Sequence, residues 1–170
     1  MADHLDFDGL VTAYYGMLYQ FAFSLTRDEA SACDLAQQTF CIWAAKGHQL
    51  RDKTKVKTWL FTTLHREFLG TRRRESRFPH IDLDYAAAEL PAITPPSVNR
   101  LDSAQVLKAL AQLDDIYQAP VALFYLQDYS YNEIAEALDV PLGTVKSRLT
   151  RGLSRLHQLL TVTLTPPSTP

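Results

Sequence analysis

Cysteine, glycine and long apolar runs are all scarce in this chain of 170 residues. The two cysteines, Cys33 and Cys41, are eight residues apart in a segment of helical pattern, which separates their backbones by roughly 12 Å at about 1.5 Å per residue. They cannot form a disulfide with each other there, and we expect both to be small buried hydrophobic residues. No apolar run approaches the roughly 18 residues of a membrane span, so no membrane insertion is expected.

The sequence also lacks the usual signs of an enzyme. Its six glycines form no phosphate-binding loop, and its five histidines are scattered rather than clustered with carboxylates. A helical enzyme would need converging acid, base or metal ligands, and His48, His65 and His157 have no evident partners. We therefore expect no catalytic site, no metal and no cofactor. The acidic N-terminus has no secretory signal, which favours a cytoplasmic location.

Apolar residues recur at steps of three and four along most of the chain, which predicts an all-α protein. A first helical domain is expected over residues 1–75. Its second helix should begin after Asp28, a capping residue, and stop at Gly47. Its third helix should cover residues 58–74, with its end frayed or bent at Gly70 because glycine is a poor helix former.

A change of composition separates this domain from a second one. Residues 76–100 contain four prolines, and three acids outnumber two bases, which is typical of a flexible linker. Helical spacing resumes over residues 101–160, the second domain. Residues 161–170 contain three prolines and short polar residues, so we expect a disordered tail after Leu160.

The second domain contains the pattern of a helix-turn-helix. Ser130 and Glu133 have the spacing of a capping box, and Val140-Pro-Leu-Gly143 forms a break before a helix that begins near Thr144. Between Val140 and Leu156 there are four basic residues and no acid, in a chain whose net charge is −2. This pattern favours a recognition helix in the major groove of DNA, although a solvated face of a bundle helix would also be basic.

A second basic region runs from Arg51 to Arg77, with nine bases and three acids. Trp59, Phe61 and Phe68 lie among these bases, and aromatic rings interleaved with cations suit single-stranded nucleic acid. The same aromatic residues could instead belong to the core, with the run of arginines at 72–74 stabilising a helix end. A third patch, residues 34–41, places Asp34, Gln37, Gln38 and Cys41 on one helical arc, which by periodicity alone is an ordinary solvated face.

In combination these motifs resemble one family, the extracytoplasmic-function bacterial RNA polymerase sigma factors of the primary sigma family. Asp34-Leu-Ala-Gln-Gln-Thr-Phe40 is similar to the family's core-binding motif, and Lys57-Thr-Trp-Leu60 through Arg74 to its helix for the minus-ten promoter element. The family's recognition helix for the minus-thirty-five promoter element resembles Gly143-Thr-Val-Lys-Ser-Arg-Leu149 followed by Arg151-Gly-Leu. The resemblance implies a promoter-specificity subunit of core RNA polymerase with no catalytic activity of its own.

The resemblance also implies roles for particular residues. Core polymerase binding would fall to Asp34, Gln37, Gln38 and Phe40. Contacts to the minus-ten DNA would come from Lys53, Lys57, Trp59, Arg66, Arg72, Arg73 and Arg74. Contacts to the minus-thirty-five DNA would come from Thr144, Lys146, Ser147, Arg148, Thr150, Arg151 and Arg155. The implied partners are core RNA polymerase, promoter DNA and, as is common in the family, an anti-sigma factor.

The sequence departs from the family pattern at Gln38, where an acid is usual, at Arg66, where asparagine is usual, and at Gly70, where aspartate is usual. The negative net charge predicts weak binding to DNA without the polymerase. The alternative is a stand-alone helix-turn-helix regulator, which would bind DNA tightly on its own at half-sites about 34 Å apart.

Overall fold

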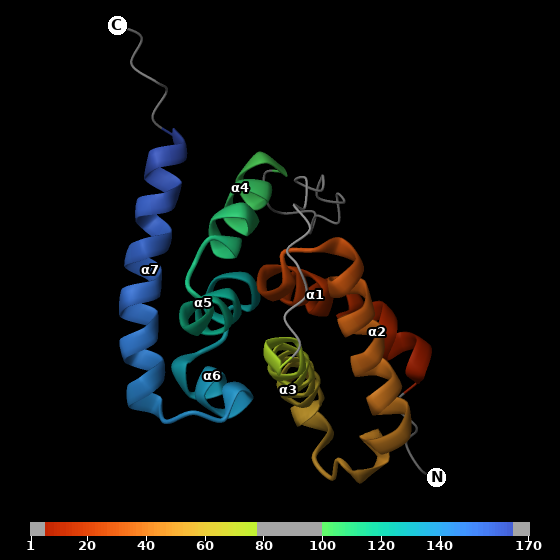
Figure 1. Ribbon diagram of the computed structural model, residues 1–170. Helices are drawn as coiled ribbons and strands as arrows, with labels where there is room; N and C mark the ends of the chain where they lie inside the picture. Colours follow the sequence, from red (N-terminus) through yellow and green to blue (C-terminus); the bar gives the residue numbers. More distant parts are fainter. Residues whose placement is uncertain (1–5, 78–99, 165–170) are drawn as a thin grey trace, which may run out of the picture.

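The computed structural model describes residues 6–77 and 100–164, and these ranges fold into helices joined by turns (Figure 1). The N-terminal group comprises α1 (Phe7–Thr26), α2 (Glu29–Lys46) and α3 (Val56–Arg77). Two 3-10 turns, η1 (Gly47–Gln49) and η2 (Lys53–Lys55), connect α2 to α3. The C-terminal group comprises α4 (Arg100–Ala111), α5 (Asp115–Gln127), α6 (Tyr131–Leu138) and α7 (Leu142–Leu164). Most of the predicted linker and the end of the predicted tail lie outside the described residues.

Local sequence signals set several helix ends as predicted. The Asp28 carboxylate accepts a hydrogen bond from the backbone N–H of Ser31 at 2.9 Å, so α2 begins just after it, and α2 ends at Gly47. At α6 the capping box is complete: the Ser130 N–H donates to the Glu133 carboxylate at 2.7 Å, and the Glu133 N–H donates to the Ser130 hydroxyl at 3.3 Å. These bonds satisfy N–H groups that have no partner inside the helix.

Three expected helix ends differ from the structure. The α3 helix runs without interruption through Gly70 to Arg77, because one glycine lowers helix stability by only about 1 kcal/mol and Arg72, two residues later, pairs with Asp115 of α5. The α7 helix begins at Leu142, where the Pro141 carbonyl accepts the N–H groups of the first turn. It also continues to Leu164 rather than ending near Leu160, because no helix-breaking residue occurs before Pro166.

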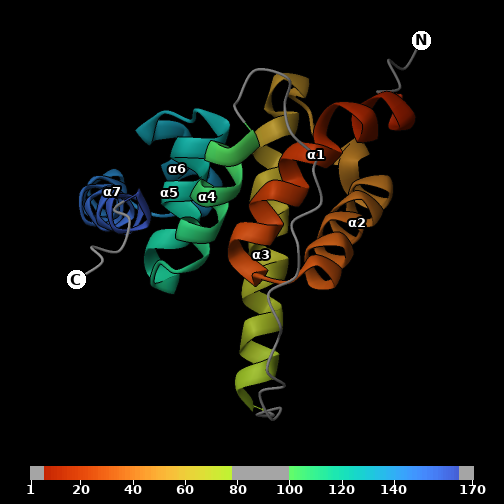
Figure 2. The same ribbon diagram turned by 90° about the horizontal axis from the view of Figure 1, so that it is seen from above.

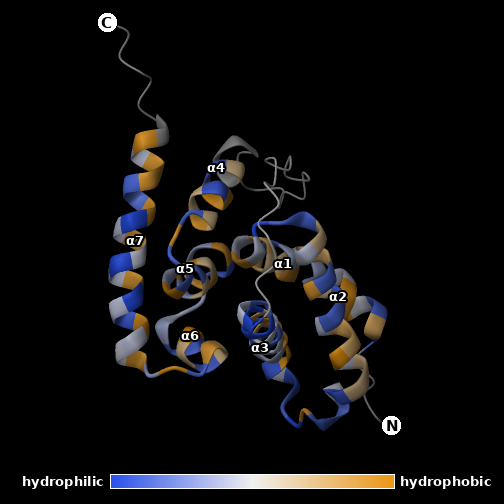
Figure 3. Ribbon diagram, viewed as in Figure 1, coloured by the Kyte–Doolittle hydropathy of each residue, from blue (hydrophilic) through white to orange (hydrophobic). Residues whose placement is uncertain are grey.

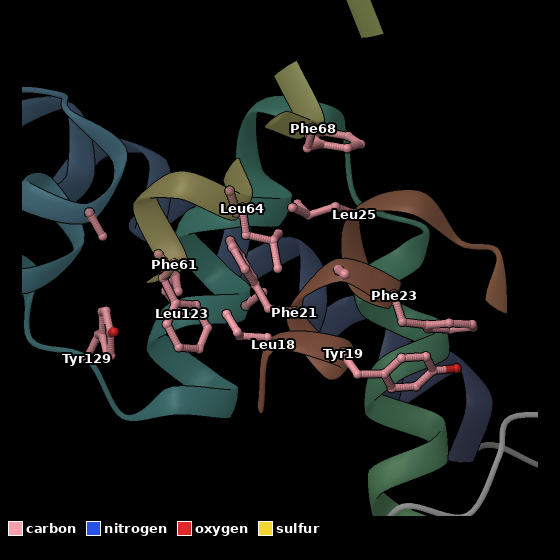
Figure 4. Close-up of a cluster of buried hydrophobic side chains, with 14 of the residues drawn as sticks. Leu18, Tyr19, Phe21, Phe23, Leu25, Phe61, Leu64, Phe68, Leu123 and Tyr129 are labelled. Atoms are coloured by element: carbon pink, nitrogen blue, oxygen red, sulfur yellow. The ribbon is translucent and has the colours of Figure 1, made fainter. Parts of the chain in front are cut away.

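The two groups of helices pack into one hydrophobic core. The α1 helix packs against α2 and α3 and also against α4 and α5, and α3 packs against α6. Figure 2 shows α1 and α3 between α2 and the C-terminal helices, with the end of α3 projecting past its neighbours. In Figure 4 Leu18 and Phe21 of α1, Phe61 of α3 and Leu123 of α5 meet, and all four are fully buried. No helix in the described ranges is long and apolar enough to cross a membrane.

Candidate polymerase and nucleic-acid interfaces

The α2 helix presents a polar face to solvent. Asp34, Gln37 and Gln38 are exposed on it, as the helical arc predicts. Phe40 points the other way and is buried, with its ring 6.4 Å from that of Phe7 and 6.3 Å from that of Tyr15. Phe40 is therefore placed to hold α2 against α1 rather than to touch a partner.

The two cysteines differ from the sequence expectation. Cys41 is exposed on α2, and Cys33 is half-buried beside the ring of Tyr15. The Cys33 side chain and burial together raise the pKa of the Tyr15 hydroxyl, with burial the larger cause. The prediction that both cysteines are buried is wrong for Cys41, because the arc that exposes Asp34 and Gln38 also carries position 41.

Two clefts lie between α2 and α3. The first follows the C-terminal half of α3, and Asp34 and Gln38 face Glu67 and Arg74 across it. The second lies near the connecting turns and is lined by Gln38, Gln49, Trp59, Thr63 and Arg66 among others. Trp59 is fixed there by an edge-to-face contact with Trp43, with ring centroids 5.1 Å apart. The structure thus places Trp59 and the exposed Arg66 together at one cleft.

The basic residues predicted for the minus-ten element do not all share one face of α3. Arg73 and Arg74 are exposed near its projecting end. Lys57 lies over the ring of Tyr129, with its Nζ 4.8 Å from the centroid, and Arg72 forms an ion pair with Asp115. Tyr129 and Asp115 belong to the C-terminal group of helices. Lys53 lies in η2, just before α3.

The apolar and polar residues of α7 lie on different sides of the helix. Val145, Leu149 and Leu156 are buried against the C-terminal group. Most of the predicted DNA-contacting side chains lie on the solvent side, where hydrophilic residues recur along α7 (Figure 3). The exposed members are Lys146, Ser147, Thr150, Arg151 and Arg155. Thr144 and Arg148 are half-buried, so they are not on the freely exposed face.

Local environments shift several pKa values. Burial, and then the nearby Arg148 guanidinium, lowers the pKa of His65 to about 4. Hydrogen bonds from Ser130 hold the pKa of the Glu133 carboxyl below its ordinary value. Burial, followed by the Glu133 charge, raises the pKa of the Tyr129 hydroxyl.

His65 was not among the predicted site residues. The sequence does contain an indication of its position. Lys57, Phe61 and His65 are spaced by four residues, so all three lie on one face of α3.

Comparison with known proteins identifies the family to which this chain belongs. Residues 10–78 match Sigma-70 region 2, and residues 103–156 match Sigma-70, region 4. The ECF RNA polymerase sigma factor SigL of Mycobacterium tuberculosis is 32% identical over 82% of this chain and 80% of its own length. The chain is an ECF RNA polymerase sigma factor. SigM of Bacillus subtilis, of the same family, is 28% identical over 89% of this chain and 93% of its own length.

A solved structure extends the likeness to both domains of this sigma factor. The sigma factor RpoE from Bartonella quintana, solved in complex with the anti-sigma factor NepR, has a TM-score of 0.75 and 30% sequence identity. The match covers 92% of this chain and 98% of that chain. The protein is therefore a specificity factor that directs RNA polymerase to promoters, and not an enzyme. This sets aside the stand-alone regulator.

Proposed function

We propose that this sigma factor binds core RNA polymerase through α2 and contacts promoter DNA through α3 and α7. Residues 1–75 serve the polymerase and the minus-ten element, residues 76–100 act as the linker, and residues 101–160 serve the minus-thirty-five element. The observation that carries the proposal is that exposed polar or basic faces occur on the helices that match the two sigma regions. Such a protein works in the cytoplasm, beside the polymerase.

On α2, the exposed Asp34, Gln37 and Gln38 form the polymerase-binding face, and the buried Phe40 positions it. An acid and two amides can accept and donate hydrogen bonds across a protein interface. The family motif at these positions supports the assignment. Gln38 supplies an amide where the family pattern has an acid, so it can donate as well as accept.

On α3, the cleft with Trp59 and Arg66 and the exposed Arg73 and Arg74 engage the melted minus-ten strand, together with Lys53, Lys57 and Arg72. An indole can stack on an unpaired base, and arginines neutralise the adjacent phosphates. The support is that Trp59 lines a cleft together with the exposed cation Arg66. Lys57 and Arg72 can contribute only after leaving Tyr129 and Asp115.

On α7, Lys146, Ser147, Thr150 and Arg151 read the minus-thirty-five element, while Thr144, Arg148 and Arg155 contact phosphates or pack. Short side chains at 147 and 150 allow the helix to lie deep in the major groove, and the long cations reach guanine edges or phosphates. The proposal also includes an anti-sigma protein as a regulatory partner. Its support is the likeness to RpoE, which was solved with NepR.

The experiment is promoter-dependent transcription by purified bacterial core polymerase with and without this protein. The variant Asp34→Ala, Gln37→Ala is expected to lose binding to core polymerase in a pull-down and to lose the specific transcript. The matched control, Gln112→Ala, Asp128→Asn, removes one amide and one acid at exposed positions outside α2, α3 and α7 and should retain both. Retention of polymerase binding by the α2 variant would contradict the assignment of this face.

A further inference from the structure

Facing sides of α2 and α3 and the turn between them form the walls of the second cleft. On α3, Trp59, Arg66 and Glu67 are each three or four residues from Thr63, so they share one side of the helix. The remaining lining residues come from α2 and η1 and the residue after it, namely Gln38, Ile42, Lys46, Gln49 and Leu50. The cavity has a volume of about 660 Å³, which lies in the range of ligand-binding pockets.

Part of this lining is apolar and suits the face of a flat ring. Trp59 is half-buried, and its edge-to-face contact with the buried Trp43 limits the positions that its indole can take. Ile42 and Leu50 are half-buried beside it in the same cleft. An aromatic ring held in this way can stack on an unpaired nucleobase.

The polar part of the lining has two complementary charges. Arg66 is exposed and Glu67 half-buried, and within residues 6–77 and 100–164 neither forms an ion pair. A guanidinium can only donate hydrogen bonds, and a carboxylate can only accept them. The cleft therefore suits a ring that presents acceptors to Arg66 and donors to Glu67.

Guanine has this arrangement of hydrogen-bonding groups. Its O6 and N7 are adjacent acceptors on one edge, and its N1–H and 2-amino group are adjacent donors on another. Adenine and thymine carry no two adjacent acceptors. Cytosine carries its two acceptors and its one amino group on a single edge, so an arginine and a carboxylate would compete for that edge.

We propose that the second cleft is a guanine-binding site, in which Trp59 stacks on the base, Arg66 donates to O6 and N7, and Glu67 accepts from N1–H and the 2-amino group. The inference rests on the proposed assignment of α3 to the melted minus-ten strand, and it names the base that this part of α3 selects. Lys46, exposed at the end of α2, neutralises a phosphate next to the bound base.

Base preference is measured with the full chain and single-stranded probes, by fluorescence anisotropy at low ionic strength, where phosphate contacts are strongest. Each probe is an oligothymidine of one length that carries guanine, adenine, cytosine or thymine at its centre. The uniform flanks let the strand shift until the central base reaches the cleft. We expect the guanine probe to bind about 5- to 150-fold more tightly than the other three, which corresponds to about 1–3 kcal/mol for a bidentate arginine–guanine pair. Equal binding of the guanine and adenine probes would overturn the guanine site.

Two variants and two base analogues test each contact separately. 7-Deazaguanine lacks the N7 acceptor, and hypoxanthine lacks the 2-amino donor. The wild type should bind both analogues more weakly than guanine. Arg66→Ala should no longer distinguish guanine from 7-deazaguanine, and Glu67→Ala should no longer distinguish guanine from hypoxanthine. If either variant still discriminates against its analogue as strongly as the wild type does, the contact assigned to that residue is wrong.

Matched controls separate base recognition from a general effect of charge. Arg73→Ala and Glu75→Ala make the same two charge changes at exposed positions on α3 that do not line the second cleft. Arg73→Ala should weaken binding of all four probes by the same factor, and both controls should keep the preference for guanine. Loss of this preference in the controls as well would show a charge effect alone and would overturn the proposal.

These measurements also distinguish the guanine site from the proposed function on which it rests. If the wild type shows no base preference but Arg73→Ala, Arg74→Ala weakens binding of every probe, the guanine site fails and the assignment of α3 to the single strand stands. If that double variant binds every probe as tightly as the wild type does, the assignment of α3 fails, and the guanine site fails with it.

Discussion

Gly152 lies on α7 where this helix crosses α5. A Cβ at this position would lie 2.5 Å from Cγ2 of Val121 and 3.1 Å from Cβ of Tyr117. Val121 is fully buried, so its γ-methyl group can move only against other core side chains in a densely packed interior. We therefore expect Gly152→Ala to lower the free energy of unfolding by about 1–3 kcal/mol, as overpacking does in other cores. Urea denaturation of the variant and the wild type measures this, and an unchanged midpoint would contradict the close helix crossing.

Gly70 provides the opposite case on α3. It lies inside a continuous helix, and a Cβ there would meet nothing within 4 Å. Gly70→Ala should raise the free energy of unfolding by up to about 1 kcal/mol, because alanine loses less conformational freedom in a helix. Thermal denaturation followed by circular dichroism checks the sign. A lower melting temperature would show that α3 needs the freedom of glycine at this point.

Among the helices, α6 depends most clearly on its N-terminal capping box. Its eight residues are too few for stability by propensity alone, and the reciprocal bonds between Ser130 and Glu133 satisfy its N-terminal N–H groups. We expect Ser130→Ala to cost about 1 kcal/mol of unfolding free energy. Ser154→Ala, at an exposed position inside α7, serves as the control and should be close to neutral. If both variants lost the same unfolding free energy, the capping hydrogen bonds of Ser130 would contribute nothing to stability.

Features of single helices could be predicted wherever the signal is local. The Asp28 cap, the stop at Gly47 and the capping box at Ser130 each depend on residues within a few positions, so the sequence pattern was sufficient. The exposure of Asp34 and Gln37 followed in the same way from helical periodicity. The predicted end of α7 near Leu160 is too early, because the polar residues from Thr161 onward are compatible with helix and the first proline is Pro166.

The docking of the two domains could not be predicted from such patterns. Its contacts join residues far apart in the chain: 81 positions separate Lys55 from Glu136, and 43 separate Arg72 from Asp115. The sequence showed the cations of the basic region, but their partners are ordinary acids on other helices. The lowered pKa of His65 could not be predicted for the same reason, because it depends on burial in the packed structure and on Arg148 of α7.

At the scale of the whole molecule, His65 makes the packed structure sensitive to pH. Burial and the Arg148 charge lower its pKa from 6.5 to about 4, so the folded protein holds this imidazole neutral where the unfolded chain would protonate it. The unfolded state therefore binds more protons below about pH 6.5, and the stability contributed by neutral His65 is lost as the pH falls from there toward 4. The carboxyls of Asp28, Asp52 and Glu133 also have lowered pKa values, and they act at more acid pH.

Melting temperatures at pH 7.5 and 5.5 therefore isolate the effect of the histidine. The wild type should melt at a lower temperature at pH 5.5, and His65→Gln should reduce this difference because glutamine cannot take up the proton. His157→Gln, at an exposed position on α7, should keep the wild-type difference. If His65→Gln kept it as well, the acid sensitivity would belong to another group. If the difference disappeared only in His65→Gln, the buried face of α3 that carries Phe61 and Lys57 would be the acid-sensitive part of the molecule.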